Sequence, residues 1–149
     1  MHVLALAAAL CNAHPVYGLK PHASPAIVGR EGTGYYRAQE RLWFTVVERT
    51  RAHVPARDLA LVRHAAGHRV LATRYARETA GTISGMGASP TLARRALARA
   101  AARFIAESKR ELDREERSYE RVTDDGLAQQ RGAAFGYPGG PDATTICGD

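Results

Sequence analysis

Two histidines four residues apart are the feature of this sequence with the most direct chemistry. His64 and His68 lie in the segment RHAAGHR, residues 63–69. Residues i and i+4 share one face of a helix, so two imidazoles at this spacing can bind one metal ion. Zinc needs at least a third protein ligand, and the downstream acids Glu78 and Glu107 have no spacing that singles out either. We therefore expect an incomplete site with less than one zinc per chain, and no cofactor.

The segment HAAGH resembles the HEAGH form of the HExxH motif of zinc proteases. It matches at His64, Ala66, Gly67 and His68 and departs at Ala65, where those enzymes have a glutamate that activates the zinc-bound water. The resemblance implies a helix that can bind metal but lacks the glutamate that hydrolysis requires. We expect no enzymatic activity.

A cluster of arginines is the second candidate site. It consists of Arg94, Arg95, Arg99 and Arg103, with no acid between them. The cluster falls in the first half of a predicted helix, where the helix dipole disfavours cations. A phosphate or an acidic protein surface would relieve this repulsion. The spacing therefore predicts a partner-binding or anion-binding surface, nucleic acid included. The alternative is a hydrated helix face whose arginine stems cover alanines.

Charge is unevenly distributed along the chain. The net charge is +6, and nineteen of the twenty-one cations are arginine. Residues 37–104 contain thirteen arginines against four acids, whereas residues 105–149 contain ten acids against six cations. This asymmetry predicts an anionic partner or the acidic face of another subunit. The two cysteines, Cys11 and Cys147, fit neither a disulfide framework nor a zinc ribbon.

The pattern of apolar residues predicts an all-α protein. We expect three helices at about 36–54, 56–83 and 90–122, which form a helical domain over residues 36–125. The last helix would be about 50 Å long and would protrude. Proline and glycine predict an extended arm over 14–35 and a Gly/Pro-rich tail over 126–149. No run of residues alternates clearly enough to predict a sheet.

The ends of the chain suggest partners. Residues 1–13 form a short apolar segment, too short to cross a bilayer, although residues 3–10 could contact a membrane surface or a partner. Arms of this composition are disordered when isolated. We therefore expect other protein subunits to order them, with the chain as a non-enzymatic structural subunit of an oligomeric assembly.

A stretch within residues 70–115 indicates which kind of assembly this subunit could belong to. The segment RYARETAGTISGMGASPTLARRALARAAARFIAESKREL resembles the smaller internal virion protein of T7-like podoviruses. Those proteins leave the capsid at infection and assemble into a conduit across the host envelope. The resemblance implies a viral protein, located in the virion, that belongs to the ejection machinery.

Three rival functions remain open at this point. An accessory subunit of a ribosomal or organellar complex has the same sequence signature as a virion component. A small helical metal-binding protein would use His64 and His68. An arginine-rich nucleic-acid-binding module would use the arginine cluster.

Overall fold

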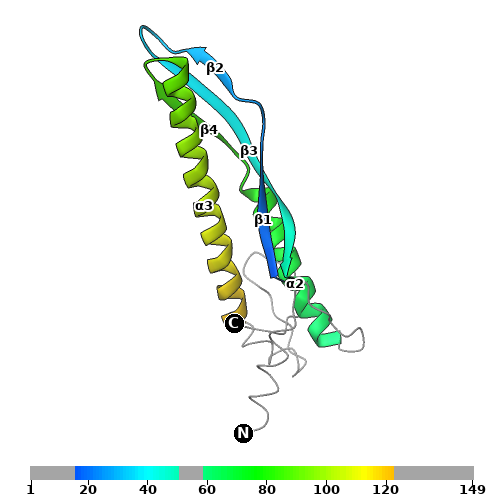
Figure 1. The fold of residues 1–149 in the computed structure, drawn as a ribbon. Coiled ribbons are helices and arrows are strands. Elements are labelled where there is room, and N and C mark those ends of the chain that lie inside the picture. Colours follow the sequence, from blue (N-terminus) through cyan, green and yellow to red (C-terminus); the bar gives the residue numbers. More distant parts are fainter. Residues whose placement is uncertain (1–15, 51–58, 123–149) are drawn as a thin grey trace. The chain divides into compact units, whose positions relative to one another are not determined.

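The computed structural model describes residues 16–50 and 59–122, and these residues form a mixed α/β structure (Figure 1). They contain a four-stranded sheet and two helices. In chain order the elements are β1 (Val16–Ala23), β2 (Ile27–Arg30), β3 (Tyr36–Thr50), α2 (Leu59–Glu78), β4 (Gly81–Gly87) and α3 (Pro90–Val122). In the sheet, β3 lies between β1 and β2 in strand order and also pairs with β4.

The prediction of an all-α fold is wrong, and the error centres on residues 36–54. Most of this segment forms the long strand β3 rather than a helix. Its buried side chains fall on alternate positions, Ala38, Leu42 and Phe44, which is the period of a strand. The exposed Trp43 and Val47 place apolar residues on the other face too. Because both faces of β3 contain apolar residues, the alternation is not visible in the sequence, and the apolar positions fit a helical period instead.

The predicted extended arm over 14–35 is also corrected where the structure describes it. Residues 16–23 and 27–30 form β1 and β2, which pair with β3 instead of projecting from the domain. Pro21 lies in β1, an edge strand among the described residues, and edge strands are where proline is mostly found within sheets. The turn before β3 has Gly32 and Gly34 at φ of 69° and 79°, in the left-handed region that favours glycine. The predicted segments 1–13 and 126–149 lie outside the described residues.

The predicted helices after residue 55 differ in accuracy. The helix predicted at 56–83 corresponds to α2, which ends at Glu78 and is followed by β4. The antiparallel ladder from Tyr36↔Gly87 to Leu42↔Gly81 explains why this segment becomes a strand. The helix predicted at 90–122 coincides with α3, and Ser89 caps it by accepting the Leu92 N–H at 3.2 Å. Neither α2 nor α3 is long and apolar enough to cross a membrane.

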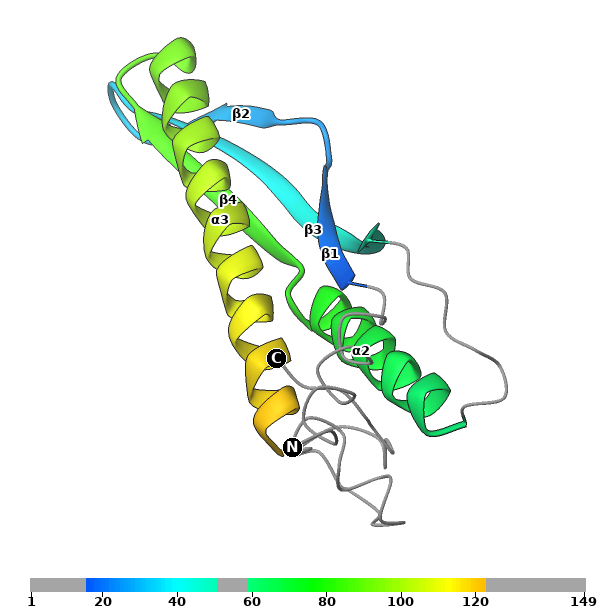
Figure 2. The ribbon, with the colours of Figure 1, turned by 60° about the horizontal axis from the view of Figure 1, so that its bottom comes forward.

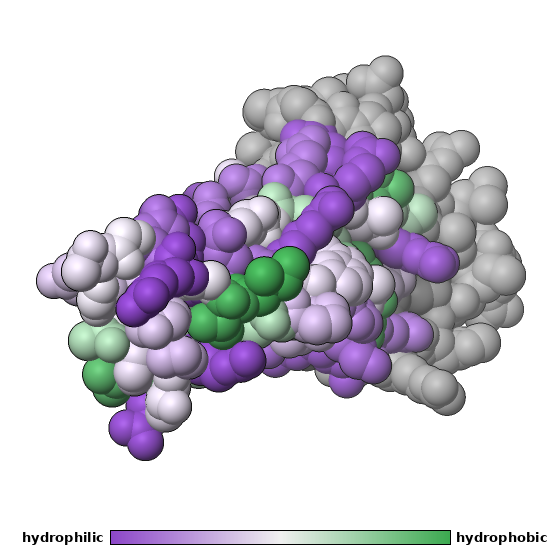
Figure 3. Space-filling view, turned by 90° about the horizontal axis from the view of Figure 1, so that it is seen from above, coloured by the Kyte–Doolittle hydropathy of each residue, from purple (hydrophilic) through white to green (hydrophobic). Residues whose placement is uncertain are grey.

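The described residues divide into two compact units. One unit contains residues 16–18, 46–50, 59–74 and 112–122, and the other contains 19–45 and 75–111. In the second unit α3 runs beside β4 (Figure 2), and Ala38 packs against Ala93 and Leu97. The face shown in Figure 3 is mostly hydrophilic, with apolar side chains in small separate groups. Scattered apolar residues of this kind are normal on a protein surface.

Gly85 allows α3 to pack closely on β4. A Cβ atom at this position would lie 2.1 Å from the Leu97 backbone nitrogen, a contact that requires the backbone to move. We expect Gly85→Ala to lower the free energy of unfolding by about 1–3 kcal/mol, measured by urea denaturation. Gly29→Ala is the matched control, because its Cβ would meet nothing within 4 Å. Equal stability of the two variants would contradict this account of the packing.

Candidate metal centre

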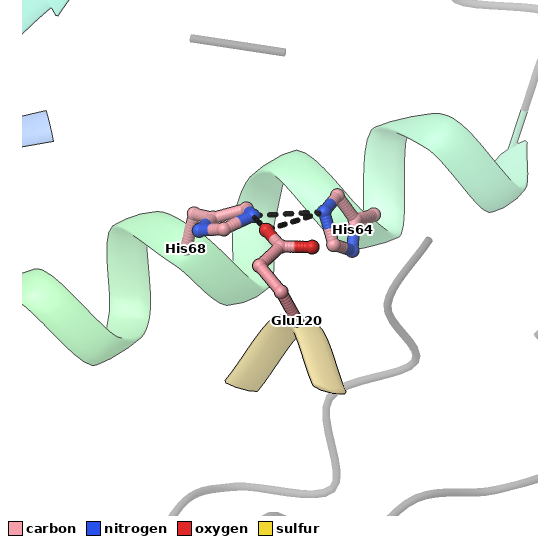
Figure 4. A group of neighbouring side chains, drawn as sticks. All are labelled: His64, His68 and Glu120. Carbon is pink, nitrogen blue, oxygen red and sulfur yellow. Dashed lines mark hydrogen bonds and ion pairs between the residues drawn. The ribbon is translucent and has the colours of Figure 1, made fainter. Parts of the chain in front are cut away.

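Two helices each contribute a pair of side chains four residues apart. His64 and His68 come from α2, and Glu116 and Glu120 come from α3, all within one unit of the chain. Because i and i+4 share a helix face, each helix presents its pair in the same direction. Figure 4 shows the side chains of His64, His68 and Glu120 pointing toward one another.

Three donor atoms of these side chains converge. The Nε2 atoms of His64 and His68 are 2.8 Å apart, and Glu120 Oε1 lies 3.3 Å from His64 Nε2. The same carboxylate oxygen also contacts His68 Nε2. Donors that bind zinc tetrahedrally at 2.0–2.1 Å lie about 3.3 Å from one another. The separation between Glu120 Oε1 and His64 Nε2 equals this value. His68 Nε2 lies closer to the other two donors and would move away from them to admit a zinc ion.

The cluster is buried, and the ring of Tyr119 packs against both of its histidines. His64, His68 and Glu120 are 0%, 3% and 1% exposed. The ring of Tyr119 stacks on His64 with centroids 5.6 Å apart and meets His68 edge-on at 4.8 Å. Tyr119 also packs against Leu71 of α2. A buried carboxylate is costly unless a positive charge and hydrogen bonds compensate it, so this site is suited to a cation.

His68 has a carboxylate at each ring nitrogen. Glu116 Oε2 contacts Nδ1, and Glu120 contacts Nε2. Burial alone would lower the pKa of His68, but the hydrogen bonds and charges of Glu116 and Glu120 outweigh it and raise this pKa to about 9. Without metal, both ring nitrogens of His68 are therefore protonated at neutral pH, and the ring is positively charged.

Sequence reasoning identified the two histidines but missed both glutamates. The cluster that could hold a metal consists of His64, His68 and Glu120, and it includes neither Glu78 nor Glu107. In the sequence, Glu116 and Glu120 are two of the many acids of residues 105–149, where a charged residue is usually solvated. One sequence feature could have indicated the two glutamates. Residues 112, 116 and 120 are four apart and share one helix face, so an apolar Leu112 predicts that this face is buried. The structure shows both Leu112 and Glu120 buried.

The structure places the predicted arginine cluster on the surface of α3. Arg94, Arg95, Arg99 and Arg103 are not buried, while Leu97 and Ala101 of the same helix are. Their position is compatible with an anionic partner but identifies none, so this function stays a prediction.

The described residues thus define a mixed α/β protein with a buried cluster of two histidines and one glutamate. The chain matches the family described as a bacterial protein of unknown function (DUF922) over residues 45–126, more than half of its length, and it belongs to that family. The match includes His64, His68, Glu116 and Glu120. Neither a curated protein nor a solved structure matches the chain.

The family match corrects one prediction. The family is described as bacterial, and this description contradicts the viral origin implied by the resemblance to podoviral proteins. The roles in ejection and assembly, the oligomeric state and the location of the protein are not tested by this match.

Proposed function

We propose that this protein binds one zinc ion through the Nε2 atoms of His64 and His68 and the carboxylate of Glu120, and that it does not hydrolyse peptides. The observation that carries the proposal is the convergence of these three buried donors from two helices. The sequence alone predicts an incomplete site because it shows no third ligand. Glu120 supplies that ligand.

The donor set favours zinc over the other common divalent ions. Two imidazole nitrogens and one carboxylate oxygen are ligands typical of zinc, whereas magnesium and calcium prefer sites made of oxygen alone. A dication would compensate the buried charge of Glu120 and would bridge α2 to α3. Zinc is therefore expected to stabilise the unit that contains the site, by about 2.7 kcal/mol at a free zinc concentration about 100 times the Kd.

The same surroundings disfavour hydrolysis. Ala65 occupies the position at which HExxH enzymes place the glutamate that activates water, and it has no group that could take a proton. Glu116 does not replace that glutamate, because its carboxylate contacts His68 Nδ1. The three donors are also almost completely buried, which leaves little access for a peptide.

Peptide hydrolysis by the zinc-loaded protein tests this part of the proposal. A pool of internally quenched fluorogenic peptides should be cleaved no faster by the zinc-loaded protein than by the zinc-free protein or by His68→Ala. A zinc-dependent rate that disappears in His68→Ala would show that the site is catalytic despite Ala65.

A further inference from the structure

Glu116 and Glu120 act on opposite nitrogens of one imidazole ring. Glu120 contacts His68 Nε2, the nitrogen that also lies 2.8 Å from His64 Nε2. Glu116 contacts Nδ1, and its side chain is only 16% exposed. The group of side chains that could share one ion contains Glu120 and not Glu116. The two glutamates are therefore not equivalent.

The position of the proton on His68 decides whether this ring can bind metal. A neutral imidazole has one N–H and one nitrogen with a free lone pair, and only the latter can be a ligand. An ionised carboxylate only accepts hydrogen bonds, so it favours the tautomer whose N–H points at it. With Glu120 bound to the metal, the carboxylate of Glu116 at Nδ1 retains its N–H and leaves the lone pair on Nε2, on the side of His64 and Glu120.

We infer that Glu116 is a positioning residue of the zinc site, which accepts the Nδ1–H of His68 and so holds the ring with Nε2 toward the metal. This inference rests on the proposed zinc binding. Hydrogen-bonded carboxylates behind ligating histidines fix the tautomer and the orientation of the ring, and their loss typically lowers metal affinity about 10- to 100-fold.

Zinc affinities of a graded series of variants test the inference. Competition with a chromogenic chelator at one pH would compare the full chain with Glu116→Leu, Glu116→Gln and Asp113→Asn. We expect Glu116→Leu to bind zinc about 10- to 100-fold more weakly. Glu116→Gln should lose less than about tenfold, because its amide oxygen still accepts the Nδ1–H. Asp113→Asn removes an exposed carboxylate of the same helix and should bind as the unchanged chain does.

Two spectroscopic measurements separate a positioning role from direct ligation. Nitrogen-15 spectra of the histidines in the zinc-loaded full chain should show His68 protonated at Nδ1 and bound to zinc through Nε2. The d–d absorption bands of cobalt-substituted Glu116→Gln should keep the positions seen in the unchanged chain, because the ligands are the same. Shifted cobalt bands would mean that Glu116 is itself a ligand, and zinc on Nδ1 would mean that the orientation is wrong. Either result overturns the inference.

The outcomes also distinguish this inference from the proposed function. If the unchanged chain binds no zinc, the proposed function fails and the inference fails with it. If the unchanged chain binds zinc and Glu116→Leu binds it within about twofold of the same affinity, well short of the expected loss, only the role of Glu116 is wrong. If Glu116→Leu does not fold, the nitrogen-15 spectrum of the unchanged chain still decides the orientation of His68.

Discussion

Glu120→Gln should lower the zinc affinity of the protein by more than about 100-fold, a larger loss than is usual for residues behind the ligands. The substitution retains the shape of the side chain but removes the charge that makes it a good ligand. Two neutral imidazoles would remain, fewer than the three protein ligands of zinc sites. Elemental analysis after dialysis should find one zinc per chain before the change and almost none after it.

A matched control is available on the same helix. Glu107 is an exposed glutamate of α3 that lies in the other unit, so Glu107→Gln should leave the zinc content unchanged. His68→Ala should resemble Glu120→Gln, because it also removes one of the three donors. Retention of one tightly held zinc in both ligand variants would place the metal elsewhere.

Zinc affinity should rise with pH until about pH 9. The carboxylates of Glu116 and Glu120 raise the pKa of His68 to about 9, so below that pH zinc has to displace a proton from this ring. Release of one proton makes the apparent Kd fall about tenfold for each pH unit between about pH 7 and 9. Competition titrations at fixed ionic strength measure this slope, and a Kd that does not change over this range would contradict it.

The metal-free protein should show the opposite dependence in its stability. The pKa of His68 is about 9 in the folded protein, above the ordinary value of 6.5 that applies to the unfolded chain. The ion pairs of protonated His68 therefore contribute their full stability below about pH 6.5 and lose it as the pH rises through 9. Thermal unfolding of the metal-free chain should occur at lower temperature at about pH 9 than at about pH 6.5. His68→Ala should lose this difference.

The sequence could predict α3 because several local signals agreed. Ser89 and Pro90 mark the start of this helix, and Leu97, Ala101 and Leu112 follow its buried face. The strands could not be predicted in the same way. Apolar residues on both faces of β3 obscured its period of two, and the short strands β1 and β2 contain or flank prolines that usually argue against regular structure.

Only the two histidines of the candidate site could be predicted from the sequence. His64 and His68 are four residues apart in sequence, so their proximity follows from one helix alone. Glu116 and Glu120 are about fifty residues further along the chain, and only tertiary packing of α3 against α2 within their unit brings them to the histidines. Without an independent indication that these two helices pack, a buried glutamate cannot be told from a solvated one. Glu120 at 1% exposure is such a case.

X-ray absorption at the zinc edge of the reconstituted full chain tests the central claim most directly. Its fine structure separates sulfur from nitrogen or oxygen ligands, gives their distances and recognises imidazole rings by their outer-shell scattering. We predict two imidazole rings and a first shell of nitrogen and oxygen at about 2.0–2.2 Å, without sulfur. A sulfur shell at about 2.3 Å would instead place the zinc at Cys11 or Cys147, the two cysteines of the chain, and would contradict a site built from His64, His68 and Glu120.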